Sequence, residues 1–554
     1  MSKDSLVKGT LILALAALVA RVLGVVQRIP LVYLIGDTGM ATFGIAFNIY
    51  TPLLTIATAG IPSALSKLVS EKMELGQYAE ADRIYKAAVR FALVAGLVMT
   101  ALLIVLAPWY GEQISKDPDA VMSIRALAPA LLLFPLIAMM RGYFQGRQMM
   151  MPNGMSQIIE QIARLITGVG LAFLLLEIGW GHVWAVAGAS FGGVMGSVGA
   201  VAVLMWYMLK LRREDAREGI AQAAKEGRAA AEAVSYKRIY GNIFRVSVPI
   251  VLFSMTVPLI YFIDSSTVIS LLEGQMGYGS AKELLGILAG RAQSLAGIPI
   301  ILAIALSQSI VPIVSSAYAR KDMAQVRQQA AKALQLSVIT GLPVVLAIAI
   351  AARPINTMLF PMDQFKYLVN ENGNGIIAFL TVTAMFQIVM QTSGSILMGM
   401  GHMRPLVVNV FIGLACKLAG SYLLAPFFGI YGIMSATALC FIVMMALNLW
   451  VLRRKVEYVI YPPRKWLGIA ATTCIIVAVC LPLEWLTHRT ITWFPDKLDA
   501  LVSGGITGGV AILLYPLLLM ASRVYTRENA EDLPPALRKL LAKLGRLVGM
   551  GKRA

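Results

Sequence analysis

The chain has 554 residues, of which 58% are hydrophobic and only 14% are charged, and its 48 Lys and Arg against 29 Asp and Glu give a net charge of +19. Soluble proteins carry about 25% charged residues, so this composition excludes an ordinary soluble enzyme or binding domain. It indicates a polytopic membrane protein, in which the 48 glycines would allow helices to approach one another closely.

About fourteen stretches are long and apolar enough for a helix to cross the bilayer, which takes roughly 20 residues. In chain order they are 10–35, 41–66, 91–110, 123–146, 157–177, 184–208, 246–270, 284–314, 335–352, 375–400, 406–425, 430–451, 466–486 and 500–522. The first stretch is too long for the apolar region of a signal peptide, so we expect it to be retained. The sequence therefore predicts an all-α protein with about fourteen transmembrane helices.

Lysines and arginines are concentrated in alternate connections between these stretches. The richest clusters lie within 67–90, 210–245 and 453–465 and in the C-terminal tail. Because basic residues are retained on the cytoplasmic side, both termini are expected in the cytoplasm. This bias accounts for most of the positive charge without a nucleic acid partner. The basic tail, 538–553, is expected to form either an amphipathic helix on anionic inner-leaflet lipids or a solvated helix.

Two parts of the chain resemble each other, which indicates an internal repeat. The segment 143–168 aligns with 396–421, and weaker matches follow in the same order on both sides. At one constant offset the alignment matches a glycine, a proline and a basic residue, namely Gly146 with Gly399, Pro152 with Pro405 and Arg164 with Lys417. Each copy would hold six helices, and because six is even, both copies would enter the membrane from the same side, as parallel repeats do.

The repeat predicts two parallel six-helix lobes around a central cavity, which is the architecture of an alternating-access transporter. Two further helices would follow outside the repeat. The expected parts are an N-terminal lobe at 1–208, a charged cytoplasmic linker at 209–245, a C-terminal lobe at 246–452, the extra helix pair at 453–522 and the basic cytoplasmic tail at 523–554.

Five basic residues lie inside the predicted spans, namely Arg21, Arg28, Arg164, Arg291 and Lys417. A charge deep in the membrane costs roughly 2.5–3.5 kcal/mol on insertion scales, so it is expected to face a cavity or a partner. Arg21 and Arg28 are about two helical turns apart, which puts them on one helix face about 10 Å apart. If the arginines share one cavity, it would attract an anion such as a diphosphate, since Arg binds phosphate oxygens in bidentate fashion.

Structural roles are open for several of these residues. Arg28 and Arg291 lie toward the outer ends of their helices and could extend to the interface. Arg164 has Glu160 one turn away, and we favour a structural ion pair there. Asp264 lies near the middle of the seventh span, where a structural partner and an ion site are equally open.

Two stretches resemble motifs of the lipid II flippases of the MurJ and SpoVB/YtgP type, in the multidrug/oligosaccharidyl-lipid/polysaccharide exporter superfamily. The segment ARVLGVVQR at 20–28 is similar to the pattern S-R-x-x-G-F-x-R-[DE], with Arg21 at the first arginine and Gln27 at the second, so that Arg28 follows one residue later. The segment GRAQSLAGIPIILAIALSQSIVP is similar to the pattern of helix 8, with Arg291 at its arginine and Pro312 at its closing proline. The second span lacks the arginine of Gram-negative members, which favours the Gram-positive branch.

The resemblance implies a non-enzymatic carrier that moves lipid II from the inner to the outer leaflet of the bacterial cytoplasmic membrane. The diphosphate would be held by Arg21, Arg28 and Arg291. The extra helix pair would form a groove for the polyprenyl tail, and no cofactor is expected.

The family includes members with a sodium site between helices 7, 11 and 12. The oxygen-bearing candidates here are Asp264, Asn409 and Thr437. Transport would be driven by Na⁺ or by the membrane potential.

Other functions remain open. The same arginines would serve a flippase for another lipid-linked oligosaccharide, such as a teichoic acid, capsule or spore-cortex precursor. A cation-coupled multidrug exporter of the superfamily is a second alternative, although embedded arginines count against it. A third is a scaffold that recruits cell-wall synthesis or sporulation proteins without transport.

The charge bias makes a topological prediction. Green fluorescent protein fused after Ala554, or inserted within 209–245, should fluoresce, and alkaline phosphatase at the same points should be inactive, because both segments are expected in the cytoplasm. A phosphatase fusion inserted at 116, in an expected outer connection, serves as the matched positive control. Phosphatase activity at the C-terminal fusion would contradict the topology.

Overall fold

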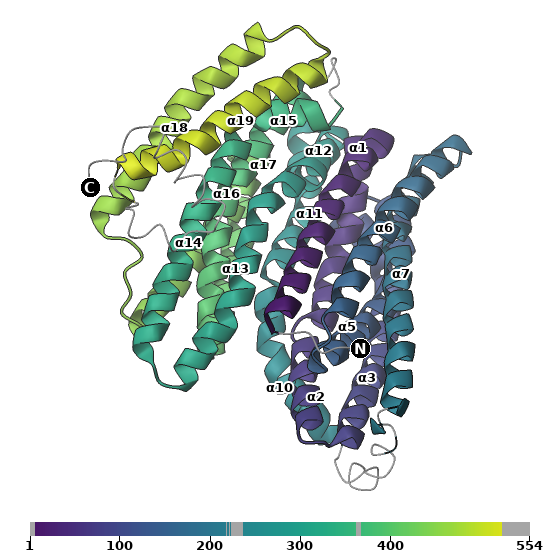
Figure 1. Ribbon diagram of the computed structural model, residues 1–554. Coiled ribbons are helices and arrows are strands. Elements are labelled where there is room, and N and C mark those ends of the chain that lie inside the picture. Colours follow the sequence, from purple (N-terminus) through teal and green to yellow (C-terminus); the bar gives the residue numbers. More distant parts are fainter. Residues whose placement is uncertain are drawn as a thin grey trace. The chain divides into compact units, whose positions relative to one another are not determined.

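The computed structural model describes residues 6–217, 219, 220, 222, 236–361, 367–522 and 524. Within these residues every regular element is a helix (Figure 1), which confirms the predicted all-α class. The helices form two compact units. The first comprises Met1–Gly290 and Val410–Ala436, and the second comprises Arg291–Asn409 and Thr437–Ala554. The division into two repeated lobes of six helices stays a prediction.

The first unit contains the N-terminal helices and the middle of a long later helix. Its elements are α1 (Leu6–Thr58), α2 (Ile61–Glu74), α3 (Tyr78–Trp109), the π-helical turn η1 (Tyr110–Ile114), α4 (Ala120–Leu127), α5 (Ala130–Gly146), α6 (Met151–Glu177), α7 (His182–Arg217), α10 (Tyr236–Ser254), α11 (Thr256–Met276), α12 (Tyr278–Gly286) and the central part of α17 (Met403–Lys455). A second π-helical turn, η2 (Ile287–Ala292), crosses from this unit into the other.

The second unit contains the remaining helices. Its elements are α13 (Gln293–Ala319), α14 (Met323–Ile350), α15 (Ala352–Leu359), α16 (Tyr367–Gly399), both ends of α17, α18 (Pro463–Thr490) and α19 (Asp496–Ala521). The last two helices run side by side as a hairpin (Figure 1).

Twelve helices among the described residues are long and apolar enough to cross a membrane. Two of these spans include the 53-residue helices α1 and α17. A straight helix of that length would be about 80 Å long, far more than the roughly 30 Å of the hydrocarbon core. Each is interrupted by a glycine in the left-handed region, Gly36 (φ 63°) and Gly429 (φ 54°), a conformation that suits glycine because it has no Cβ. The total of fourteen spans depends on counting the two parts of each helix separately, and it stays a prediction.

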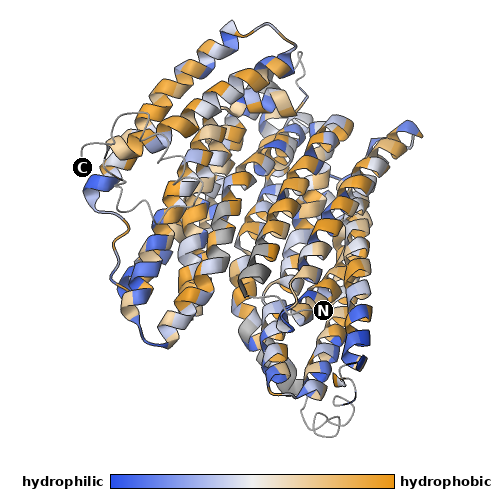
Figure 2. Ribbon diagram, viewed as in Figure 1, coloured by the Kyte–Doolittle hydropathy of each residue, from blue (hydrophilic) through white to orange (hydrophobic). Residues whose placement is uncertain are grey.

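Apolar residues dominate the middle of most helices, and polar residues gather toward the helix ends (Figure 2). Many apolar side chains also point outward. Val105 of α3 is 74% exposed and Phe427 of α17 is 80% exposed. Exposed apolar surface of this extent marks contact with lipid or with a partner, and here it continues along whole helices, as a bilayer requires.

Several helices extend beyond the predicted apolar stretches or are broken within them. α3 begins at Tyr78 although its span was expected from 91, and α14 begins at Met323 although its span was expected from 335. The stretch expected at 246–270 is divided between α10 and α11, and the stretch at 284–314 is divided among α12, η2 and α13. Hydropathy records the apolar part of a helix, whereas hydrogen bonding continues into polar turns. Most of the predicted linker and almost all of the basic tail lie outside the described residues.

Local signals explain where some helices begin. Gly60 (φ 78°) separates α1 from α2, and Pro62 lies in the first turn of α2, where its missing N–H costs no helical hydrogen bond. Asp322 caps α14, because its side chain accepts a hydrogen bond from the backbone N–H of Gln325 at 2.9 Å.

Glycines allow α6 and α7 to pack closely. A Cβ on Gly192 of α7 would lie 2.6 Å from the Cα of Gly168 and 2.9 Å from the carbonyl oxygen of Arg164. A Cβ on Gly196 would lie 2.7 Å from the carbonyl oxygen of Glu160. Small residues permit such backbone contact in membranes, and they fix the part of α6 that carries Glu160 and Arg164 against α7.

Gly192→Ala should therefore destabilise the protein by about 1–3 kcal/mol, the usual cost of overpacking a close contact. The measurement is thermal unfolding in detergent. Gly170→Ala on α6 is the matched control, because a Cβ at Gly170 would meet nothing within 4 Å. Equal stability of Gly192→Ala and wild type would show that the α6–α7 contact tolerates a side chain.

Candidate functional site

Arg21 and Arg28 lie in the first part of α1, before the break at Gly36. The side chain of Arg21 is exposed and that of Arg28 is half-buried. Tyr261 of α11 lies near both arginine side chains. This shared neighbour agrees with the prediction that the seven-residue spacing puts both arginines on one helix face.

Gln27 occupies the position of the second arginine in the motif, and Arg28 follows it. The two side chains face different neighbours. Gln27 is 5% exposed, and a Cβ on Gly168 of α6 would lie 3.1 Å from its Nε2. Arg28 instead donates a hydrogen bond from Nη1 to the backbone carbonyl of Ala289 in η2. Gln27 thus packs against α6, and Arg28 reaches the π-helical turn that also carries Arg291.

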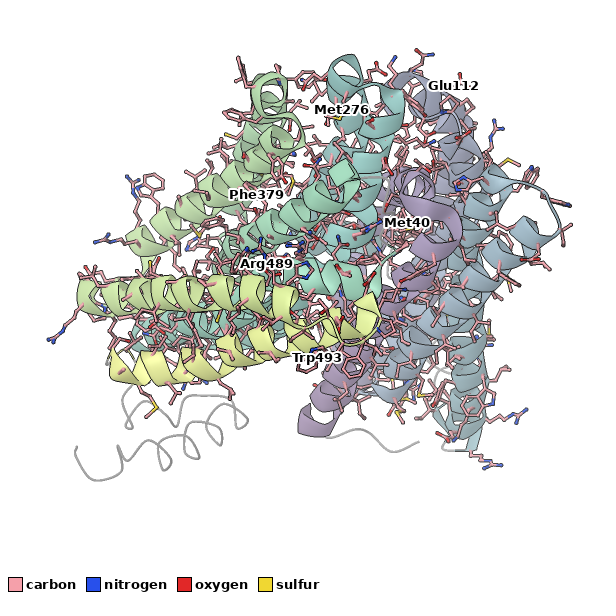
Figure 3. The ribbon with its side chains drawn as sticks, turned by 90° about the horizontal axis from the view of Figure 1, so that it is seen from above. Met40, Glu112, Met276, Phe379, Arg489 and Trp493 are labelled. Atoms are coloured by element: carbon pink, nitrogen blue, oxygen red, sulfur yellow. The ribbon has the colours of Figure 1, made fainter. Side chains whose placement is uncertain are left out.

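Gly286, the last residue of α12, and Gly290 of η2 allow these two elements to lie close to the second part of α1. A Cβ on Gly286 would overlap the backbone carbonyl of Asp37, and a Cβ on Gly290 would lie 3.1 Å from Met40. Met40 is fully buried and lies on α1 (Figure 3). π-Helical turns are rare and often occur at functional sites. The close contact of η2 with α1 therefore makes this turn a candidate part of the site.

Arg291 is buried, with 2% of its surface exposed. Its Nη1 donates a hydrogen bond to Oδ1 of Asn356 in α15 at 3.1 Å, and its guanidinium lies 5.4 Å from the centre of the Phe360 ring. Asn356 in turn donates from Nδ2 to Oδ1 of Asn374 at 2.9 Å. The side chain is held inside the second unit and does not extend to the interface.

The structure therefore brings together two of the three predicted anion-binding residues. Arg21 and Arg28 share a neighbour within the first unit, whereas Arg291 belongs to the second unit. A single cavity containing all three stays a prediction.

The embedded acid of α6 has two basic partners. Glu160 Oε1 lies 3.3 Å from Nη2 of Arg164, which confirms the predicted pair. Its other oxygen lies 2.9 Å from Nη2 of Arg141 on α5, a partner that the sequence did not indicate. The pair of Arg164 with Glu160 lies within α6, so Arg164 has a structural role. The pair of Glu160 with Arg141 joins α6 to α5.

Asp264 of α11 forms an ion pair with Lys417 of α17. Nζ of Lys417 lies 2.6 Å from Oδ1 of Asp264 and donates to the carbonyl oxygen of Ile433 at 2.9 Å. Asp264 is 4% exposed and Lys417 is fully buried. The ammonium joins α11 to α17 and bridges the break at Gly429 within α17.

The other two ion-site candidates belong to the second unit. Asn409 donates from Nδ2 to Oδ1 of Asn448 at 2.9 Å, and Thr437 is 2% exposed. An ion site formed by Asp264, Asn409 and Thr437 stays a prediction.

The sequence did not indicate a buried cluster of polar side chains around Asp117. The preceding residue, Lys116, has a left-handed backbone conformation (φ 57°). The carboxylate of Asp117 is fully buried and accepts hydrogen bonds from Thr42 at 2.6 Å and from Nζ of Lys282 at 2.8 Å. Lys282 also lies 3.0 Å from Asp119. The signal was the segment Lys116–Asp119, two acids around a proline, but it lies in a connection between helices and its partners are distant in sequence.

These features define a polytopic membrane protein with basic side chains inside its helical core. The family described as polysaccharide biosynthesis protein matches residues 6–318, and the family described as lipid II flippase MurJ matches residues 290–504. The chain belongs to the polysaccharide biosynthesis protein family, and the predicted relationship to the MurJ and SpoVB type of transporter is confirmed.

Two relatives from Bacillus subtilis (strain 168) align over most of their length. The lipid II flippase MurJ is 28% identical over 525 residues, which cover 92% of this chain and 95% of the relative. Stage V sporulation protein B is 25% identical over 540 residues, which cover 96% and 98%.

Solved structures share the fold at lower identity. A lipid II flippase MurJ in an inward closed conformation superposes with a TM-score of 0.65 at 14% identity, over 93% of this chain and all of the other. An inward-facing multidrug transporter of the MATE family superposes with a TM-score of 0.64 at 12% identity, over 78% of this chain and 94% of the other.

The ion pair of α11 and α17 allows a stability test. Lys417→Met should destabilise the protein by about 3–5 kcal/mol, because removal of one partner leaves a buried charge uncompensated. The double variant Lys417→Met with Asp264→Asn should recover most of this loss. Both effects are measured by thermal unfolding in detergent.

Lys86→Met is the control for the loss of a lysine. Lys86 pairs with Asp82 on the surface of α3, with half of its side chain exposed, so the loss should be at most about 1 kcal/mol. If the double variant were less stable than Lys417→Met, the two residues would not act as a pair.

Proposed function

We propose that this chain carries lipid II, a polyprenyl-diphosphate-linked glycan, from the inner to the outer leaflet of the bacterial cytoplasmic membrane by alternating access. The observation that carries the proposal is the arginine pair of α1, in which Arg21 is exposed and Arg28 is half-buried beside η2. Two guanidinium groups on one helix face suit the two phosphates of a diphosphate, since each can bind phosphate oxygens in bidentate fashion.

The relatives support the same substrate class. One relative that aligns over nearly the whole chain is named a lipid II flippase, and another is named for a stage of sporulation. The relative named for sporulation supports an alternative substrate within this proposal, namely a precursor of the spore cortex or another lipid-linked oligosaccharide. The same arginines would bind either diphosphate, because the diphosphate is the shared part of the two substrates.

We further propose that the membrane potential drives transport. The carboxylate of Asp264 already has a cationic partner in Lys417, which argues against a free cation at that carboxylate. The alternative is coupling to a Na⁺ gradient. Valinomycin with K⁺, which collapses the potential, should slow transport in proteoliposomes, whereas replacement of Na⁺ by choline should not.

Arg21→Ala should lower the rate of lipid II transport in proteoliposomes about ten- to a hundredfold, because one hydrogen-bonded charged contact contributes about 1.5–3 kcal/mol. The same variant should fail to support growth of a bacterium depleted of its lipid II flippase. Arg125→Ala on α4 is the matched control, since it removes another exposed arginine of the first unit.

Membrane expression of each variant is verified before growth is scored. Rescue by wild type and Arg125→Ala, but not by Arg21→Ala, supports the proposal. Rescue by all three would retain the transport and remove Arg21 from the site. Failure of well-expressed wild type to rescue growth would overturn lipid II as the substrate and favour another lipid-linked glycan or a drug.

A further inference from the structure

The ammonium group of Lys417 lies inside the first unit, beside the place where α17 is interrupted. Its Nζ is 2.6 Å from Oδ1 of Asp264 on α11 and 2.9 Å from the backbone carbonyl oxygen of Ile433. Ile433 follows the break at Gly429 by about one helical turn. Lys417 is fully buried, and Asp264 is 4% exposed. A carboxylate oxygen and a carbonyl oxygen therefore hold this positive charge in the interior of the unit.

Backbone packing holds α11 and the two parts of α17 together around this charge. A Cβ on Gly432 would overlap the backbone carbonyl of Leu424, so the two parts of α17 are in close contact across the break. α11 contacts α17 a second time, because Gln275 donates a hydrogen bond from Nε2 to the carbonyl oxygen of Ala425 at 3.1 Å. The two oxygen atoms that bind the ammonium are thus held near each other by more than the lysine.

The two similar segments of the sequence carry different acids around this position. In their alignment Lys417 matches Arg164, and Gly413 matches Glu160 at the same offset. Arg164 pairs with Glu160 on its own helix at 3.3 Å, whereas the helix of Lys417 has a glycine where that acid would lie. Lys417 pairs instead with an acid of α11, so its charge joins separate helices.

The oxygen atoms around Lys417 are also suitable ligands for a metal cation. Lysine carries a compact point charge, and hard cations take oxygen ligands, among them carboxylates and backbone carbonyls. Sodium sites in membrane transporters form where an interruption of a helix leaves carbonyl groups available. The break at Gly429 provides such an interruption, and Asp264 provides the negative charge. The groups that bind the ammonium are thus the kind of groups that a Na⁺ site requires.

We propose that the ammonium of Lys417 takes the place of a bound Na⁺ ion between α11 and α17, as a cation attached to the chain. The charge of Asp264 is then compensated at every Na⁺ concentration. The consequence for transport rests on the proposed function, because a lipid carrier with this fixed cation needs no Na⁺ gradient. The site itself does not depend on the substrate. Removal of the lysine with retention of the acid should therefore create a Na⁺ site that the wild-type chain lacks.

The new site is tested with Lys417→Ser, which removes the ammonium and leaves a hydroxyl oxygen. Unfolding of the purified protein in detergent is measured in NaCl and in choline chloride at equal ionic strength, so that general screening is the same. Wild type should be equally stable in both salts. Lys417→Ser should be stabilised by Na⁺. At a Na⁺ concentration ten times the Kd, its unfolding equilibrium constant should fall about tenfold.

Two variants serve as matched controls. Lys417→Ser combined with Asp264→Asn lacks the carboxylate and should not respond to Na⁺. Lys86→Ser removes a lysine that pairs with Asp82 on the surface of α3, and it should not respond either. A Na⁺ response of wild type, or its absence in folded Lys417→Ser, would overturn the proposal. An equal response of Lys86→Ser would be a general salt effect and would also overturn it.

Chemical rescue keeps the test decisive if Lys417→Ser folds poorly. Lys417→Ala removes Cγ, Cδ, Cε and Nζ, which correspond to the heavy atoms of n-propylammonium. This cation, present during purification, should restore the stability of Lys417→Ala. The neutral 1-propanol has a similar shape and should not. Equal stabilisation by 1-propanol would mean that the cavity, and not the missing cation, causes the loss of stability, and it would overturn the assignment.

The consequence for transport is measured separately in proteoliposomes. Replacement of Na⁺ by choline should leave the rate of lipid II transport by wild type unchanged and should slow transport by Lys417→Ser. If Lys417→Ser binds Na⁺ while wild type fails to replace a lipid II flippase in cells, the cation assignment stands and the lipid II assignment falls. If wild type transports lipid II but the stability of folded Lys417→Ser does not respond to Na⁺, the proposed function stands and this inference falls.

Discussion

The cost of placing a charge inside a membrane governs this molecule. Each embedded charge loses its hydrating water and must be stabilised by protein groups instead. The groups that do this differ from one part of the chain to another. Lys417 has a carboxylate and a backbone carbonyl, and Glu160 has two basic partners. Arg28 has the backbone carbonyl of Ala289, and Arg291 has an amide and an aromatic ring.

Some of these contacts are ion pairs, and others are made with uncharged groups. The acid–base pairs are neutral as units, and breaking them would leave a buried ion, so they hold helices together. The contact of Arg28 with the Ala289 carbonyl contains no acid, so under the proposed function this guanidinium could still attract an anion. The proposed transport of an anionic lipid would need both kinds, because the helices must be joined while the site remains positive.

Close helix packing makes these arrangements possible. The glycines of α6 and α7 bring Glu160 and Arg164 against the neighbouring helix, and Gly286 of α12 and Gly290 of η2 bring these two elements against α1. The repeat-matched glycines behave alike, although they lie in different units. A Cβ on Gly146 would lie 2.8 Å from the carbonyl of Ser66 in α2, and one on Gly399 would lie 3.0 Å from the carbonyl of Val311 in α13.

The sequence alone determined what depends on composition and on neighbours within about one helical turn. Apolar stretches predicted the all-α membrane class, and helical spacing predicted the shared face of Arg21 and Arg28 and the Glu160–Arg164 pair. Tertiary structure alone decided the partners of Asp264 and Arg291, because Lys417 and Asn356 lie on other helices and no local period relates them. It also decided that η2 is a π-helical turn and that Gln27 packs against α6. Such contacts depend on which helices pack together and on how far each is shifted along the axis of its neighbour. The packing of the whole unit determines both.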